Sequence, residues 1–126
     1  MIRKISAIVL FSAASLLLSA TAMSAESAAV KEMAQIVSTL NHHPSDKDKE
    51  QLRAIVASEK STSAERTIAN ALLNMEHHVS AADKTKLEGV TKDPAATPGE
   101  KELAGIVASI NHHATAQDKE SLSKLQ

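Results

Sequence analysis

The sequence contains no cysteine, which excludes disulfide bonds, thiol chemistry and zinc sites built on thiolates. Its one aromatic residue, Phe11, lies near the N-terminus, and there is no Tyr or Trp. Binding of single-stranded nucleic acid by stacking of bases on aromatic rings is therefore excluded for the rest of the chain. With three glycines the chain also has no glycine-rich phosphate loop. Its core has to be built from Leu, Ile, Val, Met and Ala.

The first 22 residues have the pattern of a secretory signal peptide. Two basic residues precede an apolar run over residues 5–18, and Ala20-Thr21-Ala22 fits the small-x-small cleavage pattern. We predict cleavage after Ala22, with Ala25 as the second choice. The run is shorter than the about 20 residues of a membrane-spanning helix, and no later stretch is apolar enough for membrane insertion. The mature chain, residues 23–126, is therefore predicted to be one domain, periplasmic or secreted.

This mature chain is slightly acidic. Residues 23–126 carry 12 Lys and Arg against 15 Asp and Glu, a net charge of −3 with neutral histidines. A negatively charged surface disfavours contact with a phosphate backbone. We therefore expect a protein or a metal ion as the partner, and no nucleic acid.

The mature chain repeats itself with a period of 35 residues, which is the spacing of the His-His pairs that begin at His42, His77 and His112. Asp, Lys and Leu follow each pair at fixed offsets. The period and layout resemble those of helical-hairpin repeat arrays, without the aromatic positions of the tetratricopeptide repeat. The three copies cover about residues 28–61, 62–96 and 97–126.

Each copy is predicted to form two short helices. In the first copy Met33, Ile36, Val37 and Leu40 recur at steps of three, one and three, which gives one apolar stripe on a helix. The first helices are predicted to run through the histidine pairs, over residues 28–43, 65–78 and 98–113. The fold is therefore expected to be all-α, with six short helices in three tandem hairpins that form either a short solenoid or a closed bundle.

Hydroxyl residues indicate where these helices begin. Thr62 with Glu65, and Thr97 with Glu100, match the capping box, in which side chain and backbone of the two residues bond reciprocally. A hydroxyl residue also stands three positions before an aspartate at the start of each second helix. These pairs are Ser45 with Asp48, Ser80 with Asp83, and Thr115 with Asp118.

The six histidines are the candidate site, and a structural role is the first interpretation. A histidine in the last turn of a helix can bond the free carbonyl groups there. On a helical wheel, the second histidine of each pair lies beside the apolar stripe and the first lies on the opposite side. His43, His78 and His113 would then be half-buried and bonded to the aspartate of their copy.

The second interpretation is metal binding, because imidazole is a common ligand of zinc, copper and nickel. In an open solenoid, equivalent histidines would sit roughly 10 Å apart and could not share an ion. In a closed bundle, the wheel predicts that His43, His78 and His113 converge as a three-histidine site with an open position. The candidate ligands are His42, His43, His77, His78, His112 and His113, with Asp48, Asp83 and Asp118 as carboxylate partners.

The third interpretation is pH sensing, because an unperturbed histidine has a pKa near 6.5. Protonation of all six would change the mature net charge from −3 to +3. No catalytic triad or other enzyme signature occurs in the sequence. We therefore expect a non-enzymatic periplasmic protein that binds a partner through a helical-repeat surface. The alternatives are transition-metal binding or buffering through the histidine pairs, and a pH-sensing stress protein.

Overall fold

The computed structural model describes residues 26–126, and this part of the chain is all-helical, as predicted. The predicted signal peptide lies outside the described residues. Between residues 26 and 126 no helix is long and apolar enough to cross a membrane. The helices are α1 (Ala28–Ser38), α2 (Asp46–Ala57), α3 (Ser63–Asn74), α4 (Ala81–Lys92), α5 (Pro98–Ser109) and α6 (Ala116–Ser123).

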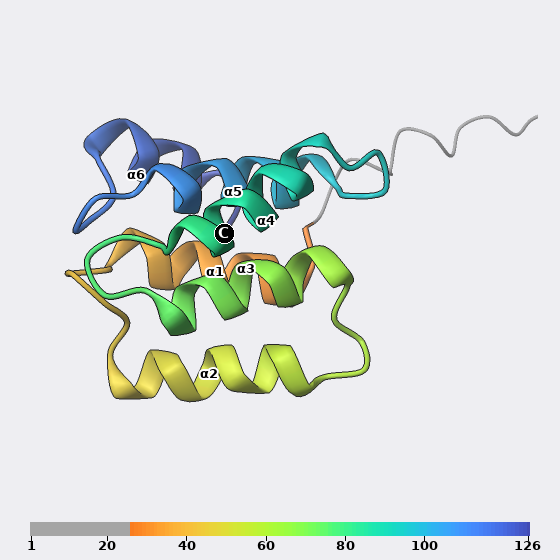
Figure 1. Cartoon of the computed structure of the whole chain (residues 1–126), viewed down its shortest axis with the longest axis horizontal. Helices are drawn as coiled ribbons and strands as arrows, with labels where there is room; N and C mark the ends of the chain where they lie inside the picture. The colour runs from red at the N-terminus through yellow and green to blue at the C-terminus, as the bar shows by residue number, and fades with distance from the viewer. Residues whose placement is uncertain (1–25) are drawn as a thin grey trace, which may run out of the picture.

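Helices α1, α3 and α5 run in the same direction, and each contacts the other two (Figure 1). Helices α2, α4 and α6 run back in the opposite direction. Helix α2 packs most extensively against α3, and α4 packs most extensively against α5. Helix α6 packs against α1, so the last helix of the chain contacts the first.

The predicted helix starts are confirmed. Thr62 accepts a hydrogen bond from the Glu65 amide and its own amide donates to the Glu65 carboxylate. Thr97 and Glu100 form the same capping box, with Pro98 in the first turn of α5. The hydroxyl groups of Ser45, Ser80 and Thr115 accept from the amides of Asp48, Asp83 and Asp118.

The predicted ends of the first helices are wrong, because α1, α3 and α5 stop at Ser38, Asn74 and Ser109, before the histidine pairs begin. At the end of α1, the Ser38 and Thr39 hydroxyls donate back to the Gln35 and Ile36 carbonyls, which competes with continuation of the helix. The last apolar residue of each stripe is still buried, but it lies beyond the helix. These residues are Leu40, Met75 and Ile110. The histidines therefore do not follow helical geometry.

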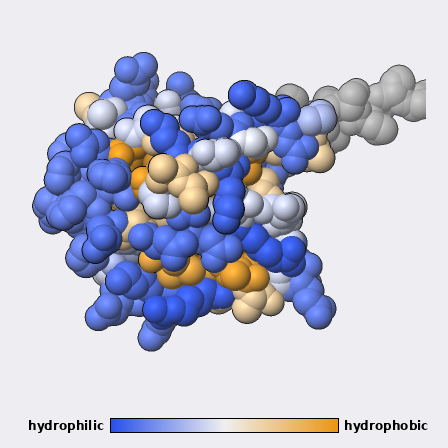
Figure 2. All heavy atoms as spheres, viewed as in Figure 1, coloured by the Kyte–Doolittle hydropathy of each residue, from blue (hydrophilic) through white to orange (hydrophobic). Residues whose placement is uncertain are grey.

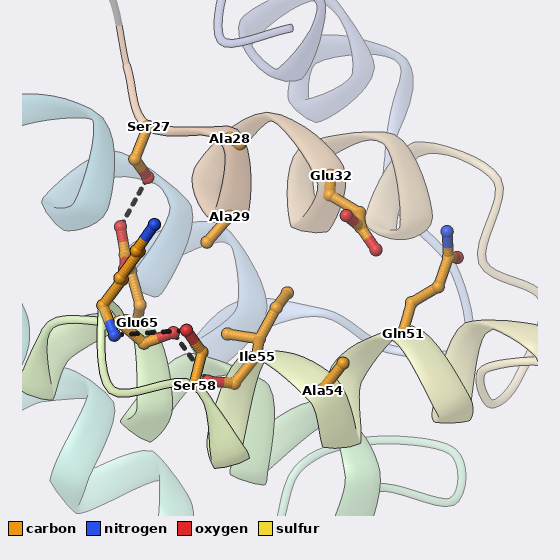
Figure 3. A pocket seen from close by; sticks show the side chains of 11 residues that line it. Ser27, Ala28, Ala29, Glu32, Gln51, Ala54, Ile55, Ser58 and Glu65 are labelled. Carbon is orange, nitrogen blue, oxygen red and sulfur yellow. Dashed lines mark hydrogen bonds between the residues drawn. The ribbon is translucent and has the colours of Figure 1, made fainter.

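The core consists of the three apolar stripes and of leucines from the second helices. Leu52, Leu87 and Leu122 are fully buried, at 0% exposure, as their equivalent positions predict. Each second helix therefore contributes one fully buried leucine to the core, and Ile55 of α2 and Val90 of α4 are also buried. The small side chains of Ala28, Ala29 and Ala54 leave a groove of about 420 Å³ between α1 and α2, where these two helices scarcely touch (Figure 3).

Hydrogen bonds between copies join the N-terminal ends of α1, α3 and α5. In each case the N-cap hydroxyl of one helix donates to the carboxylate of a glutamate that is far away in the sequence. The pairs are Ser27 with Glu65, Thr62 with Glu100, and Thr97 with Glu26. Glu65 and Glu100 are only 3% and 2% exposed, so these bonds satisfy buried carboxylates. The opposite, C-terminal ends of the same helices lead into the histidine loops.

Candidate metal centre

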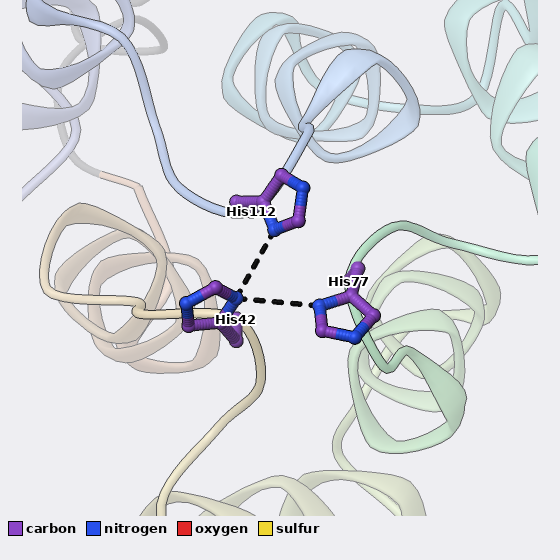
Figure 4. Close-up of side chains that lie close together, drawn as sticks. All are labelled: His42, His77 and His112. Atoms are coloured by element: carbon purple, nitrogen blue, oxygen red, sulfur yellow. Dashed lines mark hydrogen bonds between the residues drawn. The ribbon is translucent and has the colours of Figure 1, made fainter.

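The loops that follow α1, α3 and α5 meet at one end of the molecule, on the left in Figure 1. The first histidine of each pair points toward the centre of this end, so that His42, His77 and His112 face one another (Figure 4). Their ring centroids are 5.3 Å apart for His42 and His77, and 5.0 Å apart for the other two pairs. Residues at equivalent positions of the three copies are thus brought into one cluster.

Nitrogen atoms converge at the centre of this cluster. The Nδ1 atom of His42 lies 3.3 Å from Nδ1 of His77 and 3.1 Å from Nδ1 of His112. One ligand atom from each of the three rings lies within 4.8 Å of the other two. A neutral ring nitrogen holds either one proton or one lone pair, so His42 Nδ1 cannot both donate to one neighbour and accept from the other. A metal ion can instead accept lone pairs from all three rings.

The backbone at the histidine pairs explains why the first histidine turns inward. His42 and His112 have left-handed backbone angles, with φ of 71° and 73°, which are uncommon for residues other than glycine. The His43 amide donates to the Asn41 carbonyl over 2.8 Å, which closes a three-residue turn around His42. The turn directs the His42 side chain away from the course of α1 and toward the other loops.

Two backbone hydrogen bonds connect the three loops. The His42 amide donates to the His112 carbonyl, and the His112 amide donates to the His77 carbonyl, both over 2.7 Å. These bonds join residues that are 70 and 35 positions apart in the sequence. The three imidazoles are therefore held together by their backbones as well as by the packing of the helices.

The structure reverses the assignment of inner and outer histidines. His43, His78 and His113, which the helical wheel placed inside, are exposed and lie outside the cluster. Each donates its Nδ1–H to the carbonyl of the next residue, over 2.9 to 3.1 Å, because a carbonyl can only accept. The wheel failed because the helices end before the histidines and the chain then turns.

The aspartates proposed as carboxylate partners do not join the cluster. Asp48 and Asp118 accept from the amides of Ser45 and Thr115 in the capping boxes of α2 and α6. Asp83 accepts hydrogen bonds from the side chains of Asn74 and Ser80. The predicted bonds from the outer histidines to these aspartates are replaced by the bonds to backbone carbonyls. The cluster therefore offers three nitrogen ligands and no carboxylate.

The cluster lies at the molecular surface. His42 and His77 are exposed and His112 is half-buried. Burial lowers the pKa of His112 below its ordinary value of 6.5, and positive charge on His42, His77 and the neighbouring outer histidines lowers it further. The neutral imidazole, which is the form that binds a metal, is thus favoured there. The surrounding surface is hydrophilic (Figure 2).

Comparison with known proteins does not assign this chain to a family. No protein-family model matches the chain, and searches of curated proteins and of solved structures found no match either.

Proposed function

We propose that this protein binds one transition-metal ion through His42, His77 and His112. The observation that carries the proposal is the spacing of the Nδ1 atoms, 3.3 Å and 3.1 Å from His42 to the other two. Nitrogen ligands about 2.0–2.1 Å from a tetrahedral zinc ion lie about 3.3–3.4 Å from one another. The two distances from His42 therefore match those around a single ion, and one ligand nitrogen from each of the three rings lies within 4.8 Å of the other two.

The chemistry of the ligands restricts the kind of metal. Three imidazole nitrogens suit zinc, copper and nickel, whereas calcium and magnesium prefer oxygen ligands. Asp48, Asp83 and Asp118, which follow the histidine pairs, are engaged at helix starts, as in the bond from the Ser45 amide to Asp48. The spacing is closest to that of tetrahedral coordination, which zinc adopts. We therefore expect zinc to bind, with copper(II) and nickel as the competing ions.

The architecture that we propose is a closed bundle of three tandem 35-residue hairpins. Each hairpin contributes one ligand to a site on the common axis. The contact between α6 and α1 favours this closed form over a solenoid. A closed ring also lacks the extended concave surface on which solenoid repeats bind their partners. Metal binding is thus better supported than binding through a repeat surface.

We further propose that the protein works outside the cytoplasm, after removal of its signal peptide. The support is the pattern of the first 22 residues. The intact mass of protein recovered from the cell envelope is expected to match a chain that starts at Met23, or at Glu26 for the second cleavage site. A full-length mass in the membrane fraction would contradict this proposal.

Isothermal titration calorimetry with zinc, copper(II) and nickel tests the metal site. We expect one ion per chain, and a large loss of affinity in His42→Ala, His77→Ala and His112→Ala. The matched controls are His43→Ala, His78→Ala and His113→Ala, which remove the adjacent, outer histidines and should leave the affinity nearly unchanged. The proposal is wrong if the wild-type protein binds these ions no better than free imidazole, or if the outer variants lose as much affinity as the inner ones.

A further inference from the structure

The three ligands approach the centre of the cluster from one end of the bundle and leave one face of the site open. The cluster contains three histidines from residues 26–126, and no fourth His, Cys, Asp or Glu side chain of this part of the chain joins it. Two of the three, His42 and His77, are exposed to solvent. A four-coordinate ion in this site would therefore have one position accessible to a ligand from outside the chain. Structural zinc sites are closed by four protein ligands, whereas a site with three protein ligands can take water or another molecule at its fourth position.

The three ligands are not held equally. The amides of His42 and His112 donate to backbone carbonyls, whereas within residues 26–126 the His77 amide has no backbone acceptor. His42 and His112 share the left-handed turn, which His77 does not adopt. The sequence differs at the same place, because Glu76 stands where the other two copies have asparagine. His77 thus lacks the left-handed turn, and within residues 26–126 its one backbone bond to the other loops is made through its carbonyl, which accepts from the His112 amide over 2.7 Å.

A cleft gives direct access to His77 from the side. It has a volume of about 220 Å³ and lies between the first and second copies. Its lining residues are His43, Lys49, Met75, Glu76 and His77. An incoming ligand can therefore reach the ion from the open face while His77 swings into this space.

We propose that the cluster is an exchange site, which passes its metal to an acceptor by stepwise ligand substitution, with His77 the first ligand to leave. The inference rests on the metal binding proposed above. The acceptor is a protein or peptide that presents a nitrogen donor such as imidazole, because nitrogen matches the ligand preference of the bound ion. The donor enters the open position first, and His77 then dissociates. His42 and His112 hold the ion until the acceptor supplies further ligands.

The order of these events has a kinetic signature. Zinc-loaded protein is mixed in a stopped-flow instrument with an excess of the nitrogen chelator 4-(2-pyridylazo)resorcinol, and formation of the coloured zinc complex is followed. Because the entering donor takes part in the slow step, the rate should rise in proportion to chelator concentration, by about fivefold for a fivefold increase. A rate that does not depend on chelator concentration means that zinc dissociates first, and it overturns the proposal.

Equilibrium affinities test the role of His77 separately. If His42 and His112 hold the ion after His77 leaves, His77→Ala should lose less zinc affinity than either His42→Ala or His112→Ala, which are its matched controls. Equal or greater loss in His77→Ala contradicts the proposed order. If the metal-binding proposal itself is wrong, the wild-type protein takes up no zinc, and no zinc-loaded protein can be prepared for the stopped-flow experiment. Failure of the exchange proposal is distinguishable from this result, because it requires zinc-loaded protein.

Discussion

The Nδ1 atoms of His42 and His112 lie 3.1 Å apart, although 70 residues separate them in the sequence. The His42 amide also donates to the His112 carbonyl over 2.7 Å. The first and third copies therefore meet directly at the histidine cluster. A metal ion bound there would join the two ends of the helical domain, so that metal binding and folding are coupled.

Metal is therefore expected to stabilise the folded chain. At a free zinc concentration 100 times the dissociation constant, the free energy of unfolding should rise by about 2.7 kcal/mol. Urea denaturation followed by circular dichroism, with and without zinc, measures this difference. His112→Ala should remove the stabilisation, and His113→Ala, which changes the adjacent outer histidine, should keep it. Equal stabilisation of both variants would indicate that zinc binds elsewhere.

The central leucines of the second helices should carry much of the stability. Leu52, Leu87 and Leu122 are each 0% exposed, and their replacement by alanine should lower the free energy of unfolding by about 2–4 kcal/mol. The cost arises from lost apolar burial and from the cavity left behind. Lys86→Ala, at an exposed position of α4 beside Leu87, is the control and should change stability little. Urea denaturation of the metal-free protein compares these variants.

Thr62 links two copies at the end of the bundle opposite to the histidines. Its hydroxyl accepts from the Glu65 amide and donates to the buried Glu100 carboxylate over 2.6 Å. Thr62→Val removes both bonds at nearly constant volume, and we expect a loss of about 1–3 kcal/mol in the free energy of unfolding. Thr85→Val, at an exposed position within α4, is the matched control. Equal stability of the two variants would mean that the bonds between copies contribute nothing.

The lowered pKa of His112 predicts how the metal-free protein responds to acid. Because the folded pKa lies below the unfolded value of about 6.5, the unfolded chain binds the proton more readily. The contribution of His112 to stability is therefore full above pH 6.5, and it is lost as the pH falls through 6.5 and down to the folded pKa. NMR titration of the imidazoles measures that pKa. His112→Gln should show a weaker decline of stability over this pH range, and an identical decline would refute the assignment to His112.

Local sequence patterns were sufficient to predict the class of fold and the positions at which the helices begin. The apolar stripes gave the buried residues of the first helices, and the capping residues Thr62 and Thr97 gave the starts of α3 and α5. These features depend on contacts between residues three or four positions apart, which can be read from the chain directly. The 35-residue period likewise identified six histidines as the candidate ligands.

From the sequence alone we could thus predict that the described chain is helical, where its helices start and which residue type could bind a metal. Which three histidines converge follows from the tertiary structure and not from the sequence pattern. That choice depends on where α1, α3 and α5 end, on the left-handed turns at His42 and His112, and on the backbone bonds between the loops. The helical wheel selected the wrong histidine of each pair because it continued a local period past Ser38, Asn74 and Ser109, where the helices end. The backbone bonds that join the loops connect residues 35 and 70 positions apart, and no local pattern encodes such contacts.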